Sequence, residues 1–421
     1  MSIFFIFKAE ARAQGAVYTK GSLSVSFSGV KTYSNTSGSD NWPVTWASDD
    51  NQYTSWGDGN GFSGPTRVSI GVGRITGSSV GTLSGTNIWS GSGKSYGMLE
   101  VDGVLNMWVC GTASDGSAYD VQKLYRSTNY KTTNSASFSS VNWEFNKTNG
   151  GNFFCPTFLQ FGKAYSGAPD GYVYIYAPKI DNSNWEVQPS GEIFLLRVPK
   201  ADIANRSSYQ FYSGTVGGGS SAFWTTDINA KKAVFKDEIN GVMRTSVTYN
   251  AGLGRYILTT QQISRNLPGS YIGIYDAPNP WGPWTTVLFT DARSAGLQGA
   301  EGKTVFWNFS NKWTSLDGKN SVMIYTGNDI LATATATFTN TSSPLPTKTP
   351  TPTPKPTGTN TPTPSINGDA NGDGFVDEVD YSIWKTYYNQ TVTGGVIKGD
   401  FNLNGKVDGV DYLIWLHSST G

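Results

Sequence analysis

Two aspartates, Asp40 and Asp58, belong to a stretch whose residue types could carry out acid–base chemistry. Residues 40–62 read DNWPVTWASDDNQYTSWGDGNGF. Segments 43–48 and 52–56 favour strands, and the Asp-Asp-Asn sequence at 49–51 favours a turn between them. In such an antiparallel hairpin, residues whose numbers sum to about 99 face each other. Since 40 and 58 sum to 98, we expect the two carboxylates to meet at the open end of the hairpin.

A neighbouring pair of carboxylates can hydrolyse glycosidic bonds when one carries a proton and the other stays ionised. We expect Asp58 to be the acid, because it follows Trp56 and precedes a Gly-rich segment, and Asp40 to be the base. Trp42 and Trp56 frame the pair and could stack on a sugar, although packing in the core is the alternative for each ring.

Further polar residues are expected on the same face of the domain. Glu301 is a third catalytic candidate. Asp181 and Asp329 are candidates for substrate binding, and Arg244 could clamp the substrate. Most other acidic residues lie in predicted turns, where aspartate is favourable for the backbone alone.

Composition excludes several classes of function. The only histidine, His417, is near the C-terminus, so the large domain cannot use a Ser-His-Asp triad or a His-ligated metal. The formal charge of zero indicates no nucleic-acid partner, and no stretch is long enough to span a membrane. Cys110 and Cys155 form either one disulfide or two buried thiols.

The elements that must position these residues repeat five times between residues 20 and 340. Each repeat is an apolar strand, a tight turn and an aromatic-rich strand, with turns at 49–51, 102–103, 170–171, 252–254 and 317–318. A single hairpin cannot bury both of its faces, and radial repetition solves that problem. We therefore predict an all-β five-bladed β-propeller over 20–340, with a β-sandwich or barrel as the alternative.

The segments flanking this domain have different compositions. Residues 1–19 resemble a shortened secretion leader with a small-x-small cleavage site, which predicts an exported protein, secreted or held at the cell surface. Residues 341–367 are rich in Pro and Thr and predict an extended linker.

The remaining unit, 368–421, contains a duplicated motif with the spacing of calcium loops. Position 6 of each loop is a glycine, as the sharp turn requires, and a hard cation such as Ca²⁺ prefers the oxygens that the other positions supply. The predicted ligands are Asp369, Asn371, Asp373, the Phe375 carbonyl, Asp377 and Asp380 in the first loop, and Asp400, Asn402, Asn404, the Lys406 carbonyl, Asp408 and Asp411 in the second.

One helix is expected after each loop, with Val379, Ile383, Trp384 and Tyr387 on one face of the first and Val410, Ile414 and Trp415 on one face of the second. A small α-helical module of duplicated loop–helix units behind a Pro/Thr linker resembles a type I dockerin, which implies two bound Ca²⁺ ions and a cohesin-like protein partner. Loop positions 10 and 11, commonly a hydroxyl pair in cellulosomal dockerins, are here Glu378-Val379 and Gly409-Val410.

The large domain carries a second resemblance. Its opening block, followed by RVSIGVGRI, GMLEVDGVLNMWV, CPTFLQFG, YVYIYAP, YNAGLGRY and IYDAPNPWGPWT, resembles a bacterial family of five-bladed propellers of formerly unknown function, related to endo-D-arabinanases. The resemblance implies that Asp40 and Asp58 are an acid–base pair. The sequence as a whole thus predicts a secreted glycoside hydrolase acting on a polysaccharide. A non-catalytic carbohydrate-binding propeller, a surface scaffold displayed through the dockerin and a polysaccharide lyase are the alternatives.

Overall fold

The computed structural model describes residues 15–111, 118–132, 135–182, 186–216, 219, 221–263, 271–297, 304–340, 367–371, 376–393 and 395–418. The chain divides into two compact units, Met1–Leu345 and Pro346–Gly421. Glu301, Asp373 and Phe375 lie outside the described residues, as do residues 1–14 of the predicted leader and nearly all of the predicted linker. The predicted domain boundaries therefore stay predictions.

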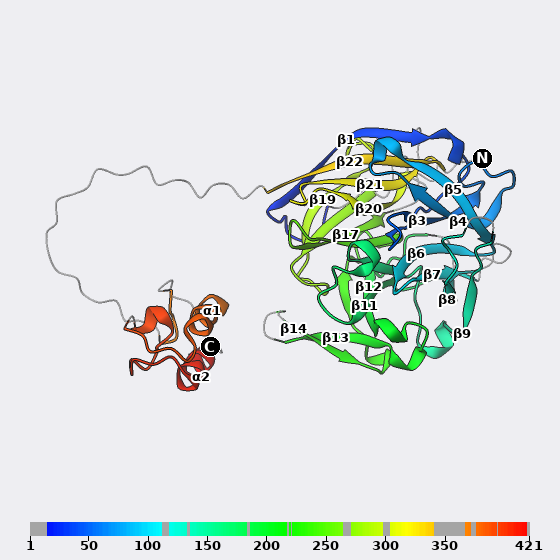
Figure 1. The fold of residues 1–421 in the computed structure, drawn as a ribbon. Helices are drawn as coiled ribbons and strands as arrows, with labels where there is room; N and C mark the ends of the chain where they lie inside the picture. Colours follow the sequence, from blue (N-terminus) through cyan, green and yellow to red (C-terminus); the bar gives the residue numbers. More distant parts are fainter. Residues whose placement is uncertain are drawn as a thin grey trace, which may run out of the picture. The chain divides into compact units, whose positions relative to one another are not determined.

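The first unit contains β-strands arranged as consecutive antiparallel blades, of which the third and fourth are joined into one ten-stranded sheet by a parallel strand pair (Figure 1). Blade 1 contains β2 (Val44–Trp46), β3 (Gln52–Gly59), β4 (Val68–Thr76) and β5 (Ser84–Gly91). Blade 2 contains β6 (Lys94–Val101), β7 (Val104–Cys110), β8 (Gln122–Ser127) and β9 (Ser139–Phe145). Blade 3 contains β10 (Thr157–Gln160), β11 (Tyr172–Pro178), β12 (Glu192–Pro199) and β13 (Gln210–Val216), extended by β14 (Ser221–Thr225) and β15 (Ala233–Lys236).

The last two blades complete the unit. Blade 4 contains β16 (Thr245–Asn250), β17 (Arg255–Gln262), β18 (Tyr271–Ala277) and β19 (Thr285–Asp291). Blade 5 contains β20 (Thr304–Thr314), β21 (Asn320–Gly327) and β22 (Leu331–Asn340), and its fourth strand is β1 (Leu23–Tyr33) from the start of the domain. Figure 1 shows β1 beside β22, with which it pairs. This pairing joins the first strand of the domain to its last blade.

The innermost strands of the five blades form a closed ring. β2 contacts β6, β6 contacts β10, β10 contacts β16, β16 contacts β20, and β20 contacts β2. Five blades around a closed ring of inner strands are a five-bladed β-propeller, so the predicted fold is confirmed. The inner two strands of each blade are the five hairpins predicted from the sequence.

The apolar core lies between neighbouring blades. One cluster, which includes Tyr53, Ile70, Met98 and Met107, is shared by blades 1 and 2. Other clusters join blades 2, 3 and 4, blades 4 and 5, and blades 5 and 1. Each fully buried large side chain contributes roughly 1.5–3 kcal/mol to folding. Because these side chains are buried by the adjacent blade, the ring as a whole is the stable unit.

The second unit is helical and much smaller. It contains α1 (Glu378–Tyr387) and α2 (Gly409–Ser418) around a core of Ala370, Trp384, Val392, Phe401 and Val407. Most residues of the two predicted apolar faces pack there, but Val379 and Val410 are 51% and 53% exposed. Both valines lie in the first turn of their helix, and the other residues of the two predicted faces pack in or against this core. None of the helices described could cross a membrane.

Candidate functional site

The hairpin of β2 and β3 brings Asp40 and Asp58 together, as its sequence predicted. Val44 pairs with Thr54 in the ladder. At the open end, the Asp40 N–H donates to the Gly57 carbonyl at 3.0 Å, and the Gly57 N–H donates to the Asp40 carbonyl at 2.8 Å. Asp40 therefore lies opposite the residue that precedes Asp58. Both Asn41 and Asp58 have positive φ, 57° and 58°, a strained backbone conformation that recurs at functional sites.

Asp40 is held in a mostly buried position, with 18% of its side chain exposed. Its Oδ1 accepts a hydrogen bond from Asn41 Nδ2 at 2.7 Å, and its Oδ2 lies 3.4 Å from Arg244 Nη2. Burial raises the pKa of Asp40 to about 6; the Arg244 guanidinium opposes this shift, and the charge of Asp58 adds to it. About half of Asp40 is therefore protonated at pH 6 and roughly a tenth at pH 7.

Asp58 has a different environment. Its side chain is 46% exposed, and its Oδ1 lies 2.5 Å from Lys94 Nζ. Lys94 also donates to the Ser69 carbonyl at 2.8 Å. Of the two aspartates, Asp58 is the more accessible, and it forms an ion pair with the Lys94 ammonium group. The two carboxylates thus occupy unlike environments within one site.

Residues of four blades converge around Asp40. Arg244, which precedes β16, donates from Nε to Asn41 Oδ1 at 2.7 Å and from Nη1 to Gln261 Oε1 at 2.9 Å. The Asn41 N–H donates to Thr326 Oγ1 of blade 5 at 2.9 Å, and Asn41 Nδ2 lies 3.3 Å from the Tyr96 hydroxyl of blade 2. The ring of blades therefore fixes the orientation of Asp40.

Lys94, Asn41 and Tyr96 were not among the residues predicted from the sequence. Lys94 starts β6 and pairs with Cys110 at the end of β7. It thus occupies the open end of the second hairpin, as Asp40 does in the first. Applying the same register argument to every hairpin would have placed Lys94 near the pair.

Two predicted substrate contacts are corrected by the structure. Trp42 is fully buried and Trp56 is 1% exposed, so neither ring can stack on a sugar. The two rings pack against each other and against Phe62, with the Trp42 and Trp56 centroids 6.0 Å apart. Their role is to anchor the hairpin that carries the aspartates.

The predicted role of Arg244 is also corrected. With 4% of its side chain exposed, Arg244 orients Asp40 and is too buried to clamp a substrate.

The other predicted acidic residues lie in different places. The charge of Asp329 contributes to the raised pKa of Asp40, and its carbonyl accepts from the Ser39 N–H at 3.0 Å, so Asp329 belongs near the pair. The described contacts of Asp181 are all within blade 3, where its Oδ2 accepts from the Ser190 N–H at 2.7 Å and its Oδ1 lies 3.8 Å from Lys179 Nζ. These local contacts account for the aspartate at position 181 without a role in substrate binding.

The two cysteines lie close to this site. Cys110 and Cys155 come from neighbouring blades, as expected, and their Sγ atoms are 3.8 Å apart. Both are buried free thiols. The sequence left open a disulfide or two buried thiols, and the structure contains the two thiols. Tyr96 and the half-buried Tyr119 pack in or against the same cluster.

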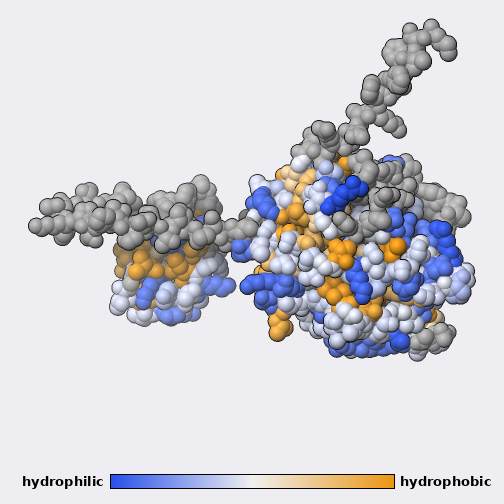
Figure 2. Space-filling model, turned by 90° about the horizontal axis from the view of Figure 1, so that it is seen from above, coloured by the Kyte–Doolittle hydropathy of each residue, from blue (hydrophilic) through white to orange (hydrophobic). Residues whose placement is uncertain are grey.

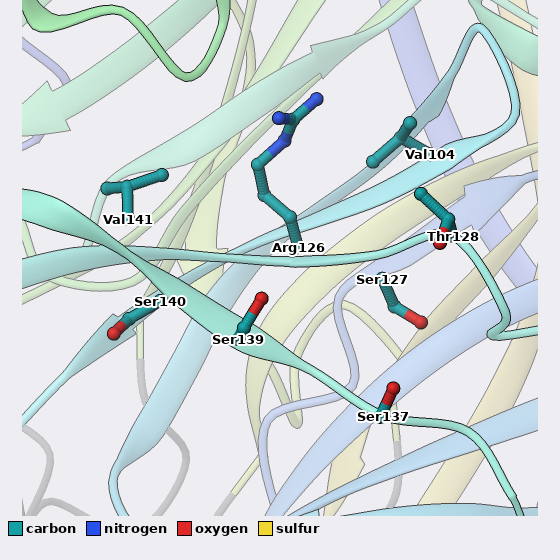
Figure 3. A pocket seen from close by; sticks show the side chains of 8 residues that line it. All are labelled: Val104, Arg126, Ser127, Thr128, Ser137, Ser139, Ser140 and Val141. Carbon is teal, nitrogen blue, oxygen red and sulfur yellow. The ribbon is translucent and has the colours of Figure 1, made fainter.

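A groove elsewhere on blade 2 contains none of the predicted site residues (Figure 3). It has a volume of about 270 Å³ and is lined by Val104, Arg126, Ser127, Thr128, Ser137, Ser139, Ser140 and Val141. Val104 follows the turn at the far end of the β6–β7 hairpin from Lys94. The groove is therefore separate from the carboxylate pair.

The second unit holds the predicted calcium loops. In the second loop, the Asp400 carboxylate accepts from the Asn404 N–H at 3.1 Å, and the Asp411 carboxylate accepts from the N–H groups of Asn402 and Asp408 at 3.0 and 2.9 Å. Asp400 is 2% exposed and Asp411 is fully buried. Neither forms an ion pair with a lysine or arginine among the described residues.

The first loop has the same construction where it is described. The Asp380 carboxylate is fully buried and accepts from the N–H groups of Ala370, Asn371 and Asp377 at 2.7, 3.1 and 2.8 Å. Asp377 caps α1 by accepting from the Val379 N–H. In the described part of the chain, no three acidic, histidine or cysteine side chains form a metal-binding group. Asparagine and backbone oxygens would have to complete each calcium site, with the Lys406 carbonyl contributing in the second loop.

The second unit can be identified from its sequence match. Residues 367–415 match the dockerin type I domain model. This unit is thus similar to type I dockerins and is called the dockerin unit below. Dockerins of this type bind calcium, and the buried carboxylates that lack a protein cation fit that ion. In this dockerin the exposed apolar residues include Val379, Val410, Leu413 and Leu416, and Figure 2 shows apolar residues gathered on one side of the unit.

The propeller also matches a known family. Residues 107–301 match a domain of unknown function, DUF4185, as the sequence resemblance implied. The matched range begins in blade 2, after both aspartates. The sequence has no match among curated proteins.

Several solved structures are similar to this chain. One is a putative hydrolase from Bacteroides ovatus, with 11% identity over 70% of this chain and 85% of that chain and a TM-score of 0.44. Others are an α-L-arabinofuranosidase from Podospora anserina (8% identity, 76% and 98% coverage, TM-score 0.43) and a family GH43_1 enzyme from Xanthomonas citri (11% identity, 73% and 89% coverage, TM-score 0.42). The propeller assignment itself rests on the sheet topology described above.

Proposed function

We propose that this chain is an exported glycoside hydrolase that cleaves a polysaccharide with Asp40 and Asp58 as its acid–base pair. The observation that carries the proposal is the contrast between the two carboxylates. Asp40 is mostly buried with a pKa raised to about 6, whereas Asp58 is half-exposed and paired with Lys94. Glycoside hydrolysis requires two neighbouring carboxyl groups, one of which carries a proton, and the raised pKa of Asp40 fits that requirement.

The environments indicate which residue has which role. Asp40 carries the proton and gives it to the leaving glycosidic oxygen, because its burial favours the neutral acid. Asp58 remains ionised and acts on water or on the anomeric carbon from the more exposed side. This assignment reverses the roles expected from the sequence, since the flanking Trp56 does not desolvate Asp58 but packs into the core.

The same contrast argues against a purely carbohydrate-binding propeller. A carboxylate that only accepts hydrogen bonds from sugar hydroxyls works best when it is ionised. The raised pKa of Asp40 brings no benefit to such binding, whereas the cross-blade contacts of Arg244 and Asn41 would orient Asp40 in either role. For a general acid, both features are useful.

A panel of polysaccharides, including D-arabinan because of the family resemblance, tests this proposal through release of reducing ends. Wild-type protein should hydrolyse at least one polysaccharide. Asp40→Asn and Asp58→Asn should each lower kcat by several orders of magnitude while circular dichroism and substrate binding stay unchanged. Binding without hydrolysis by wild-type protein would support the carbohydrate-binding alternative. Near-wild-type turnover by either variant would refute the pair, and Glu301 would then be the next candidate.

We also propose that the dockerin attaches this hydrolase to a cohesin-like protein outside the cell. Support comes from the dockerin match and from the exposed Val379 and Val410, which occupy the loop positions that commonly hold hydroxyl residues. An apolar pair at these positions favours a cohesin with a complementary apolar surface. Immobilised cohesins of several types should capture the full chain in calcium and release it in EGTA. Equal capture in both buffers would contradict a calcium-dependent dockerin interaction.

A further inference from the structure

Lys94 extends from blade 2 into blade 1, where its ammonium group is almost completely enclosed. Nζ lies 2.5 Å from Asp58 Oδ1 and 2.8 Å from the Ser69 carbonyl, and only 8% of the side chain is exposed. Exposed ion pairs contribute little to stability, and enclosing an ammonium group costs several kcal/mol before pairing is counted. An ion pair between a buried lysine and a half-exposed carboxylate therefore contributes little to the stability of the fold.

The stem of Lys94 is fixed by packing against the hairpin. A Cβ atom at Gly57 would lie 3.2 Å from Lys94 Cδ and 2.7 Å from Asp40 Oδ1. The aliphatic stem of Lys94 and the Asp40 carboxylate thus both pack against Gly57, in space that a larger residue at this position would fill. As a result, the position of the ammonium group relative to both aspartates is set by the blades and not by solvent.

Other charged and titratable groups face the pair from every side. Arg244 of blade 4 and Asp329 of blade 5 act on Asp40, and Tyr119 of blade 2 interacts with both aspartates. Arg244 influences the pKa of Asp40 more than Lys94 does. Each carboxylate therefore has its own cation, Arg244 for Asp40 and Lys94 for Asp58.

We propose that Lys94 is the positioning residue of Asp58, fixing the orientation of its carboxylate beside Asp40 in the proposed acid–base pair. This inference rests on the proposed hydrolase function and adds a residue from a second blade to its site. It predicts that the charge of Lys94, and not only its bulk, is required.

The test compares Lys94→Met, which keeps most of the bulk, with Lys94→Arg, which keeps the charge. Lys123→Met is the matched control, because Lys123 is in the same blade and pairs with Glu144 at 3.4 Å but is 47% exposed. On the polysaccharide that the panel identifies, Lys94→Met should lower kcat by about 100-fold with KM changed less than about threefold. Lys94→Arg should recover part of the loss, and Lys123→Met should match wild type.

A second measurement needs no substrate. With ¹³Cγ-labelled aspartate, the Asp58 resonance, assigned by its loss in Asp58→Asn, should move in Lys94→Met, because the carboxylate loses its ion pair, and should stay in place in Lys123→Met. An unmoved Asp58 resonance in Lys94→Met, or the same change in the control, would overturn the proposal. Lys94→Gln replaces Lys94→Met if the latter does not fold. If wild-type protein hydrolyses no polysaccharide, the hydrolase function fails, and the resonance measurement still decides whether Lys94 controls Asp58.

Discussion

The propeller site and the dockerin loops both collect carboxylates, but they do so over very different distances in the sequence. In the second loop, every contact of Asp400 and Asp411 comes from within ten residues. In the propeller, Arg244 is 203 residues from the Asn41 side chain to which it donates. Local spacing is enough to build a calcium loop, whereas the carboxylate pair requires the closed ring of blades.

The two regions also differ in the source of positive charge. Asp40 and Asp58 each have a protein cation, Arg244 and Lys94 respectively. Asp400 and Asp411 are buried and, among the described residues, have none. A buried carboxylate without a cation is costly. The dockerin should therefore depend on an added ion for its fold, and the propeller should not.

Removal of calcium should produce the largest effect. If it had no effect on the dockerin, the proposed difference between the two regions would be wrong. In EGTA the full chain should lose the helical circular dichroism of α1 and α2, since a unit of this size has little core to hold it together. The melting transition of the propeller should stay nearly unmoved. Helicity unchanged in EGTA would show that the loops, like the propeller, need no added cation.

A smaller effect is expected from Gly57→Ala, which tests how closely the ring positions the pair. The new Cβ would lie 2.7 Å from Asp40 Oδ1, so the carboxylate must move. We expect roughly a 10–100-fold loss of turnover from this misplacement, with little change in the melting temperature. Gly171→Ala is the matched control, because a Cβ there meets nothing within 4 Å and Gly171 lies in a turn of blade 3. Equal activities of the two variants would show that the Asp40 position is not critical.

The smallest effect concerns the surface of the dockerin. Val410→Asp places a charge on a side chain that is 53% exposed and should weaken capture by a cohesin about tenfold, an ordinary cost for one interface residue. Polysaccharide turnover and calcium-dependent helicity should not change, because Val410 is an exposed side chain that supplies no ligand oxygen. Lys406→Ala, a change at an exposed loop residue, serves as the control. If Val410→Asp binds every captured cohesin as wild type does, the exposed valines are not the contact surface.

The contrast between local and cross-blade contacts explains how much of the fold and of the site could be predicted from the sequence. The hairpin registers and the loop spacings are local patterns, so the five blades, the meeting of Asp40 with Asp58 and the two calcium loops were all predictable. The burial of Trp42 and Trp56 was not, because it depends on packing against blade 5 and Phe62. Lys94 could have been placed near the pair by the register of its own hairpin, but the contacts of Arg244 and Thr326 with Asn41 cross blades, and a single sequence gives no direct signal for them.

The central claim is that Asp40 holds a proton under conditions in which Asp58 does not. Its most direct test is the titration of the Asp40 carboxyl group, observed through ¹³Cγ-labelled aspartate and assigned by its loss in Asp40→Asn. We predict a midpoint near the pKa of about 6 that burial imposes. Folded protein should correspondingly gain stability relative to Asp40→Asn as pH falls from 7 to 4, because the folded state binds the proton more tightly than the unfolded state. A midpoint at or below the ordinary value of about 3.9 for aspartate would contradict the account, since Asp40 could then not serve as the acid.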